Sequence, residues 1–187
     1  MSSRWRKVAL GPGLVVVLAA AAVAAEAAGQ EAVQGKAAGA LERFKALAGE
    51  WKGTNSKGET VSISYEIVAA GSAVLERFVH SAEDPSPMLT VYHLDKDDLM
   101  LTHYCMVGNQ PRMRAKTLSG DEVAFDFLDA TALASPETGH MHRALFRFQG
   151  RDRFTTEWTW RENGRDAFTE VVVANRMASA AAAGSVR

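Results

Sequence analysis

The segment Leu47-Ala-Gly-Glu-Trp-Lys-Gly-Thr54 most constrains how this chain can fold, because it places Gly49 and Trp51 between a helical pattern and a long series of strand patterns. Glycine tolerates the backbone angles of a sharp turn from helix into strand. A tryptophan two residues later can lie across the floor of a closed sheet and plug it. The arrangement favours a small up-and-down barrel with an internal cavity, so binding is the first functional hypothesis.

Residues 1–27 have the pattern of a signal peptide. An apolar run of about a dozen residues over 14–25 follows three basic residues, Arg4, Arg6 and Lys7. Ala-x-Ala cleavage sites occur within 22–27. A transmembrane helix needs roughly 20 apolar residues, so the alternative of an uncleaved membrane anchor fits less well. We expect a protein that is exported to the periplasm or secreted, with no stable membrane insertion after cleavage.

Charge and cysteine content exclude two further classes. The chain has 21 basic and 22 acidic residues, and these are interspersed. Nucleic-acid binding needs a basic stripe, so we expect no nucleic-acid partner. Cys105 is the one cysteine of the chain, which rules out an intramolecular disulfide. It is expected to be a buried small hydrophobic residue; an intermolecular disulfide or a reactive thiol is the alternative.

Domain boundaries follow from composition and periodicity. Residues 28–40 are rich in Ala, Gly and Gln and are predicted to be a linker. A short amphipathic helix is predicted from residue 41, because Leu41, Phe44 and Leu47 recur at helical spacing. Its apolar face is expected to cover one end of the barrel. The barrel domain is predicted over 41–177, and the Ala-rich residues 178–187 are predicted to be a disordered tail.

From Trp51 onward the apolar period changes to two, which predicts strands. Nearly every consecutive pair is joined by a tight turn, such as Asn163-Gly164. This hairpin linkage favours an all-β, up-and-down antiparallel barrel over a Greek-key sandwich. We expect about ten strands, near residues 50–54, 60–68, 73–80, 88–94, 99–107, 112–118, 122–129, 140–148, 153–161 and 166–175.

A helix, the Gly49-x-Trp51 pair and then about ten strands resemble the calycin group of lipocalins, fatty-acid-binding proteins and nitrobindin-like haem proteins. The opening over 47–53 looks like the nitrobindin-like branch, and 99–113 looks like exported bacterial proteins of unknown function. The resemblance implies that Gly49, Trp51 and Arg176 form a structural plug, since the group often pairs this Trp with a basic residue near the end of the last strand. It also makes haem a possible cofactor. Fatty-acid-binding proteins carry a helical lid after the first strand, for which this chain leaves no room.

Histidines are the first candidates for metal or haem ligands. If Leu94 faces Leu99 in a hairpin, then His103 lies opposite Thr90 and His93 lies on the other face of the sheet, so the two cannot share a metal. His140 and His142 share a face, but no third ligand is placed beside them by the sequence. We therefore expect no metal site.

The richest polar cluster surrounds one turn, and its best candidates for ligand contacts are His103, Tyr104 and Arg112. Only one of the adjacent His103 and Tyr104 can face inward. Arg112 shares a strand face with Arg114 and Lys116; this face is either solvated or directs an Arg at a ligand carboxylate.

Apolar lining is expected from Phe125, Phe146 and Trp158, although a packed core has the same composition. Glu157 and Glu170 lie within strands, but neither has a partner fixed by spacing, so no acid–base pair can be argued. No recognised nucleophile or phosphate motif is present.

We therefore expect an exported protein that holds a small hydrophobic or amphipathic molecule inside a β-barrel. Three alternatives stay open: haem ligated by one His, a small enzyme that uses Glu157 as a base, and a filled barrel with a structural role. The sequence leaves the oligomeric state open.

Overall fold

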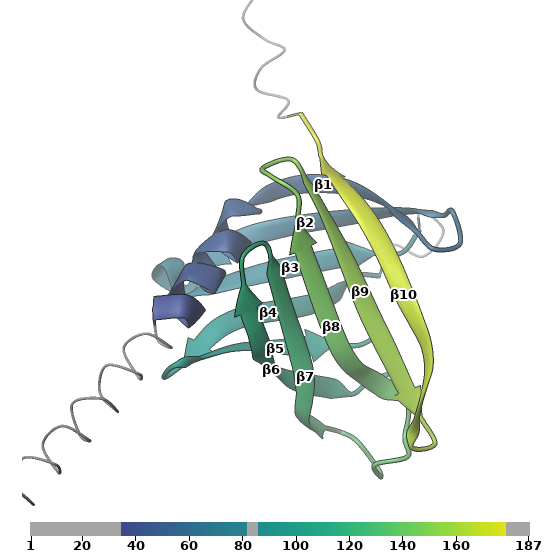
Figure 1. Ribbon diagram of the computed structural model, residues 1–187. Coiled ribbons are helices and arrows are strands. Elements are labelled where there is room, and N and C mark those ends of the chain that lie inside the picture. Colours follow the sequence, from purple (N-terminus) through teal and green to yellow (C-terminus); the bar gives the residue numbers. More distant parts are fainter. Residues whose placement is uncertain (1–34, 82–85, 179–187) are drawn as a thin grey trace, which may run out of the picture.

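The computed structural model describes residues 35–81 and 86–178 (Figure 1). The predicted signal peptide, the first residues of the predicted linker and nearly all of the predicted tail lie outside this part of the chain. Within it, no helix has the length and apolar character needed to cross a membrane.

Ten antiparallel strands close into a barrel in which each strand pairs with its neighbours in the sequence and β1 pairs with β10. The prediction of an all-β, up-and-down barrel of about ten strands behind a short helix is confirmed. The strands are β1 (Gly49–Asn55), β2 (Thr60–Val68), β3 (Ala73–Val79), β4 (Met88–Asp95), β5 (Asp98–Tyr104), β6 (Gln110–Ser119), β7 (Glu122–Thr131), β8 (His140–Phe148), β9 (Arg153–Glu162) and β10 (Arg165–Arg176).

Register in the β4–β5 hairpin is as predicted: Leu94 pairs with Leu99, Thr90 with His103 and His93 with Met100. The predicted end of β5 at residue 107 is wrong, because the strand ends at Tyr104. Residues 105–108 form a turn in which the Gly108 amide donates to the Cys105 carbonyl at 3.0 Å. Gly108 adopts a positive φ of 88°, which ends the extended backbone.

The N-terminal helix spans residues 35–46, so it begins six residues before its predicted start, and the prediction of a linker over 35–40 is wrong. Alanine is the best helix former, and sequence reasoning gave this propensity too little weight. Ala37 and Ala40 are buried on the same face as Leu41, Phe44 and Leu47, at spacings of three and four residues.

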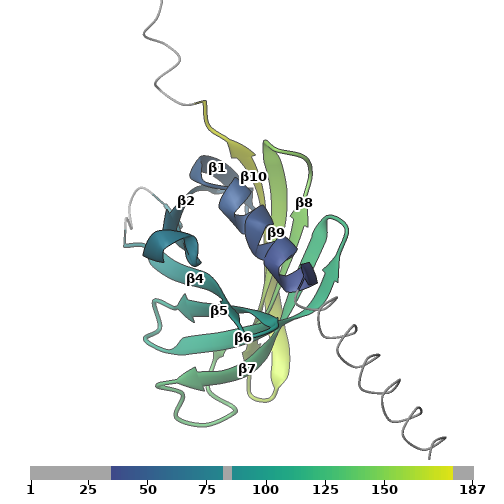
Figure 2. The same cartoon turned by 90° about the vertical axis from the view of Figure 1, so that its left-hand side faces the viewer.

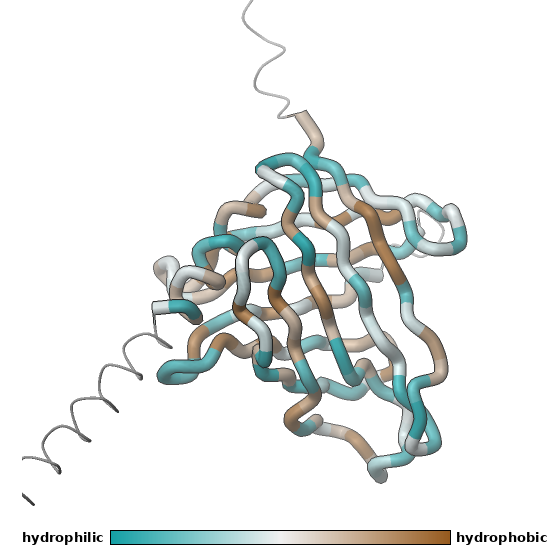
Figure 3. Tube along the Cα trace, in the orientation of Figure 1, coloured by the Kyte–Doolittle hydropathy of each residue, from teal (hydrophilic) through white to brown (hydrophobic). Residues whose placement is uncertain are grey.

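This helix lies across one end of the barrel (Figure 2). Phe44 is fully buried and stacks on Tyr92 with ring centroids 4.2 Å apart. Edge-on contacts join the Phe44 ring to Phe146 at 5.0 Å and to Phe125 at 6.0 Å. The half of the barrel under the helix is therefore a packed aromatic core. Figure 3 shows the alternation of apolar and polar residues along the strands that produces it.

Gly49, Trp51 and Arg176 come together where the helix enters β1. Trp51 is 1% exposed, its indole Nε1 donates to the Leu47 carbonyl at 2.7 Å, and the Arg176 guanidinium lies 4.3 Å from its ring centroid. Gly49 has a φ of 121°, which an L side chain rarely adopts, and a Cβ there would lie 3.4 Å from Arg176 Nη1. Glycine at this position therefore permits both the turn and the approach of the guanidinium.

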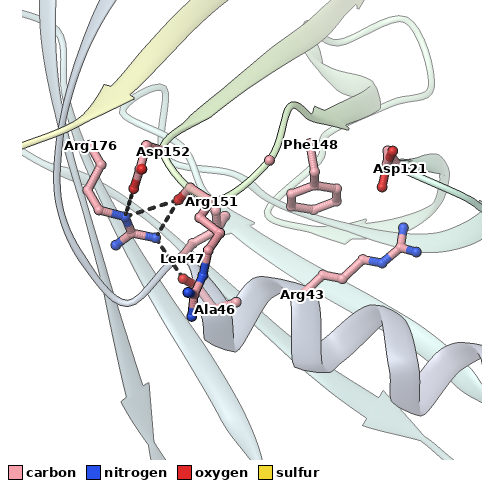
Figure 4. A pocket seen from close by; sticks show the side chains of 9 residues that line it. Arg43, Ala46, Leu47, Asp121, Phe148, Arg151, Asp152 and Arg176 are labelled. Carbon is pink, nitrogen blue, oxygen red and sulfur yellow. Dashed lines mark hydrogen bonds and ion pairs between the residues drawn. The ribbon is translucent and has the colours of Figure 1, made fainter.

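Arg176 also joins three segments of the chain (Figure 4). Its guanidinium donates to the carbonyls of Ala46 and Ala48 at 2.7 and 2.9 Å and to that of Arg151 at 3.0 Å, and it pairs with Asp152 at 3.2 Å. Arg176 is thus the direct link between the end of the helix, the β8–β9 turn and the last strand.

Replacing Arg176 by Ala is expected to lower the free energy of unfolding by about 3 kcal/mol, because it removes charged hydrogen bonds to carbonyls at the helix end together with the cation–π contact. Urea denaturation would measure the loss. Arg153→Ala is the matched control, since Arg153 makes one exposed bond to Gln149, and it is expected to cost less than about 1 kcal/mol. Equal losses in the two variants would contradict the role given to Arg176.

Candidate functional site

The end of the barrel opposite the helix holds an open cavity of about 690 Å³, called here the mouth cavity. Alternate connections of an up-and-down barrel lie at the same end, and the β1–β2 and β5–β6 connections and the end of β3 border this cavity. The surface of its wall is largely apolar, although half of the lining residues are polar. The apolar residues are Met88, Met106, Val107, Met141, Trp160 and Phe168; the polar ones are Ser56, Lys57, His80, Cys105, Thr169 and Glu170.

Large apolar side chains are exposed at the rim. Met106, Val107 and Phe168 are 56%, 56% and 55% exposed. Phe168 follows a β-bulge in β10, and its ring stacks on Trp160 with centroids 6.2 Å apart. Covering these neighbouring apolar side chains would remove them from water and so lower the free energy, which is typical of a surface that binds another molecule.

A much smaller space, of about 20 Å³, lies deeper in the barrel and shares Met88, Met141 and Glu170 with the mouth cavity. We call it the inner end. Its remaining lining residues are Glu76, Phe78, His103, Trp158 and Val172. The His103 and Trp158 rings are in contact there, with centroids 5.0 Å apart. The mouth cavity thus narrows onto a polar floor.

That floor belongs to a row of polar side chains at paired positions on four neighbouring strands: Tyr65 on β2, Glu76 on β3, Thr90 on β4 and His103 on β5. The Thr90 Oγ1 atom lies 3.0 Å from His103 Nδ1 and 3.5 Å from Glu76 Oε1. Tyr92 donates its hydroxyl to Glu76 Oε2 at 2.7 Å. All of these residues are buried.

Burial shifts the proton equilibria of the row. Desolvation raises the pKa of the Glu76 carboxyl, and hydrogen bonds from Tyr92 and Thr90 lower it by a smaller amount. Desolvation and the charge of His80 lower the pKa of His103 to about 4. The His103 ring is therefore neutral at pH 7. Its Nε2 atom is buried without a hydrogen-bond partner, and it borders the inner end.

A second interior carboxylate, Glu170 on β10, lies between the inner end and the mouth cavity. Its Oε1 atom accepts from Asn55 Nδ2 at 3.3 Å and lies 3.9 Å from His80 Nδ1. The Glu170 side chain is only 17% exposed. The carboxylates of Glu76 and Glu170 therefore make the deep part of this cavity acidic.

Four of the candidate ligand-binding residues lie inside the barrel. His103 and Trp158 line the inner end. Phe125 and Phe146 are fully buried and belong to the aromatic core under the helix. The expectation that these two phenylalanines line a cavity therefore needs correction: the helix fills the space that they face.

The other three candidates, Tyr104, Arg112 and Glu157, lie on the outer face. Side chains alternate along a strand, so an inward His103 turns Tyr104 outward, where it is 48% exposed. Arg112 pairs across the sheet with the outward Thr102, and its guanidinium binds Asp129 through Nε at 2.6 Å and through Nη2.

Glu157 precedes the inward Trp158 and binds Arg147 on the outside. Arg112 therefore does not reach a ligand inside the barrel, and Glu157 is not a base for one.

Glu76 and Thr90 were not predicted from the sequence as site residues, and no interaction partner was predicted for Glu170. Glu76 lies between Val74 and Phe78 at every second position of β3, so it shares their inward face. This alternation was the sequence signal for a buried carboxylate.

The remaining candidate groups are accounted for locally. His140 Nε2 lies 3.1 Å from His142 Nδ1, and His140 Nδ1 bonds the Thr138 carbonyl at 2.7 Å. Within residues 35–81 and 86–178, no group of three or more His, Cys, Asp or Glu side chains could hold a metal ion. Cys105 lines the mouth cavity half-buried, and burial raises the pKa of its thiol.

A separate surface pocket of about 560 Å³ lies at the helix end (Figure 4). Arg43, Arg151, Arg176, Asp121 and Asp152 contribute its charged side chains.

No protein-family model and no curated protein matches this chain. Among solved structures, a protein of unknown function from the DUF3598 family of Nostoc punctiforme is similar at 10% identity and a TM-score of 0.49, over 72% of this chain and 49% of that one. This chain thus spans about half the length of the Nostoc protein.

Rv2717c from M. tuberculosis is similar at 14% identity and a TM-score of 0.49, over 74% of this chain and 98% of that one. EF1p2_mFAP2b, bound to DFHBI, is similar at 11% identity and a TM-score of 0.31, over 71% and 95% of the two chains. Likenesses this low carry no argument about function. The class of protein rests on the chain's own barrel, which is consistent with a calycin-like fold.

Protonation of His103 is expected to destabilise the protein in mild acid. Because the pKa of His103 falls from 6.5 to about 4 on folding, the unfolded chain binds more protons between these pH values, and stability falls as the pH falls through that window. The raised pKa of Glu76 has the opposite effect, so the comparison should be made with His103→Gln. From pH 7 to 4.5 the unmodified protein is expected to lose about 2 kcal/mol more than the variant.

Urea denaturation at several pH values would measure this difference. Parallel pH profiles for the two proteins would contradict the depressed pKa of His103. Glu157→Gln, on the outer face, is the control and should follow the unmodified protein.

Proposed function

We propose that the protein binds a small apolar or amphipathic molecule in the mouth cavity. The observation that carries this proposal is an open cavity of about 690 Å³ whose wall surface is largely apolar and is formed by methionine, valine and aromatic side chains. Cavities of this size and character are typical of small-molecule sites. Methionine side chains adapt to irregular ligand shapes, which suits a site that accepts hydrocarbon.

Hydrophobic burial sets the scale of the expected affinity. A ligand with ten methylene-sized groups gains at most about 8 kcal/mol at about 0.8 kcal/mol per group. Association costs at least about 4 kcal/mol, so a plain hydrocarbon chain is expected to bind with a Kd of about 1 mM or weaker. Tighter binding requires polar contacts as well, and the inner end offers them.

Export to the periplasm or to the medium is part of the proposal, and the signal-peptide pattern of residues 1–27 supports it. A binding protein without an intramolecular disulfide depends on its core for stability, and the aromatic packing under the helix provides that core.

Haem is the second candidate that the sequence offered. His103 has the free Nε2 atom that a ligand to iron needs, but the space beside it is about 20 Å³, far smaller than a porphyrin. Haem on His103 therefore does not fit. His80 lines the wider part of the cavity, and a Soret band in the purified protein would point to it. The catalytic alternative built on Glu157 loses its base, because that carboxylate binds Arg147 on the outer face.

Charged substitutions at the rim are expected to weaken binding of a neutral apolar fluorophore such as N-phenyl-1-naphthylamine. Phe168→Glu and Met106→Glu each place a carboxylate at an apolar, exposed position of the mouth, where folding should tolerate it. Each is expected to raise the Kd about tenfold, measured by fluorescence titration. Leu128→Glu is the matched control: Leu128 is 43% exposed on β7 and does not line the cavity.

Equal affinities in all four proteins, or no binding in any of them, would contradict the proposal. Native mass spectrometry of the purified protein is a second check, since a bound molecule of defined mass would be lost from Phe168→Glu and retained by Leu128→Glu.

A further inference from the structure

The inner end has a definite sign of charge and a definite hydrogen-bonding character. Among the residues that line it, the ionisable side chains are Glu76, His103 and Glu170, and neither lysine nor arginine is present. The wider mouth cavity adds His80, Cys105 and one cation, Lys57, on the exposed β1–β2 turn. The acidic side chains are therefore concentrated at the floor, and the positive side chain is at the rim.

With Glu76 ionised, the hydrogen bonds of the polar row indicate which atom of His103 carries the proton. A Glu76 carboxylate can only accept, so the Thr90 hydroxyl donates its one proton towards it. The Thr90 oxygen must then accept from His103, which places the imidazole proton on Nδ1. The neutral ring is left with a lone pair on Nε2, the buried atom without a partner at the inner end.

Glu170 gives a second acceptor from the facing wall. It lies on β10, across the barrel from His103 on β5, and both side chains line the inner end. Asn55 donates to one Glu170 oxygen at 3.3 Å, and no contact within the described residues occupies the other. A group placed between His103 and Glu170 therefore meets two acceptors.

On the basis of the proposed function, we propose that the inner end selects an amphipathic molecule with a hydrogen-bond-donating head, an alcohol or an amine, held between His103 Nε2 and Glu170. A hydroxyl donates one bond to His103 and presents its methylene stem to the Met88, Met141 and Trp158 side chains. An ammonium donates to both acceptors and also offsets the Glu170 charge. A carboxylate is disfavoured, because it donates nothing and is repelled by the Glu170 carboxylate.

Three ligands with the same tail test this selection: 1-decanol, decylamine and decanoate, titrated at pH 7.5 and followed by intrinsic tryptophan fluorescence. The alcohol or the amine is expected to bind at least tenfold more tightly than decanoate. Glu170→Gln should lower the affinity for decylamine about tenfold, and so reduce the difference in affinity between decylamine and decanoate. Glu157→Gln, an equal charge change on the outer face, should leave all three affinities unchanged.

A ¹⁵N NMR spectrum of the unmodified protein tests the His103 tautomer without a substitution in the buried row. A proton on Nδ1 supports the proposal, and a proton on Nε2 overturns it. The same titration distinguishes the two head groups. Tighter binding of decylamine assigns the dominant contact to Glu170, and tighter binding of 1-decanol assigns it to His103.

Decanoate that binds as tightly as the alcohol and the amine would overturn the selection and leave the binding function standing. If none of the three ligands binds and N-phenyl-1-naphthylamine does not bind either, the binding function itself fails. These outcomes keep the two proposals apart.

Discussion

Closure of β1 on β10 is the constraint on which the rest of the molecule depends. In the register of that pairing, Trp51 lies opposite Arg176, and the Arg176 side chain reaches the carbonyls of Ala46 and Ala48 at the end of the helix. One residue therefore joins the strands that close the barrel to the segment that covers it. A slip of one position would reverse inside and outside along every residue of the strand.

A closed barrel of ten strands is wider than its own side chains readily fill, and the chain handles its two halves differently. At the helix end, Phe44 enters from outside the sheet and completes an aromatic core with Tyr92 and Phe146. At the opposite end no comparable element enters among the described residues, and the space stays open as the mouth cavity. The cavity is thus a consequence of a barrel that is filled from one side only.

Much of this architecture could be predicted from sequence, because the local pattern of apolar residues and turns determines where each strand begins and ends. Alternation and turns gave the bounds of β2 and β8 and the pairing of His93 with Met100. The functional candidates fared less well, because parity shows which residues share a face but does not show which face of a strand points inward. Arg112 and Tyr104 were chosen for their place near one turn, yet a period of two sends both outward once His103 faces in. The contacts of Glu76 with Tyr92 and Thr90 join different strands, so no local pattern reports them.

The polar row is costly to bury. Burial of a carboxylate is unfavourable unless hydrogen bonds compensate, and Glu76 obtains them from Tyr92 and Thr90. The same row leaves His103 Nε2 buried without a partner, at about 1 to 3 kcal/mol for such an atom.

A barrel selected for stability alone would place an apolar residue in the position of His103, as it does at Leu101 on the same strand face. The His103 side chain borders the inner end, and in the proposed tautomer its proton is on Nδ1, on the side of Thr90 and Glu76. In the proposed binding mode Glu76 lines the inner end and also orders the Thr90 hydroxyl, and through it the His103 ring. A hydrogen-bonded row across paired strands transmits that preference rigidly, since every member lies at a fixed register position in a closed sheet.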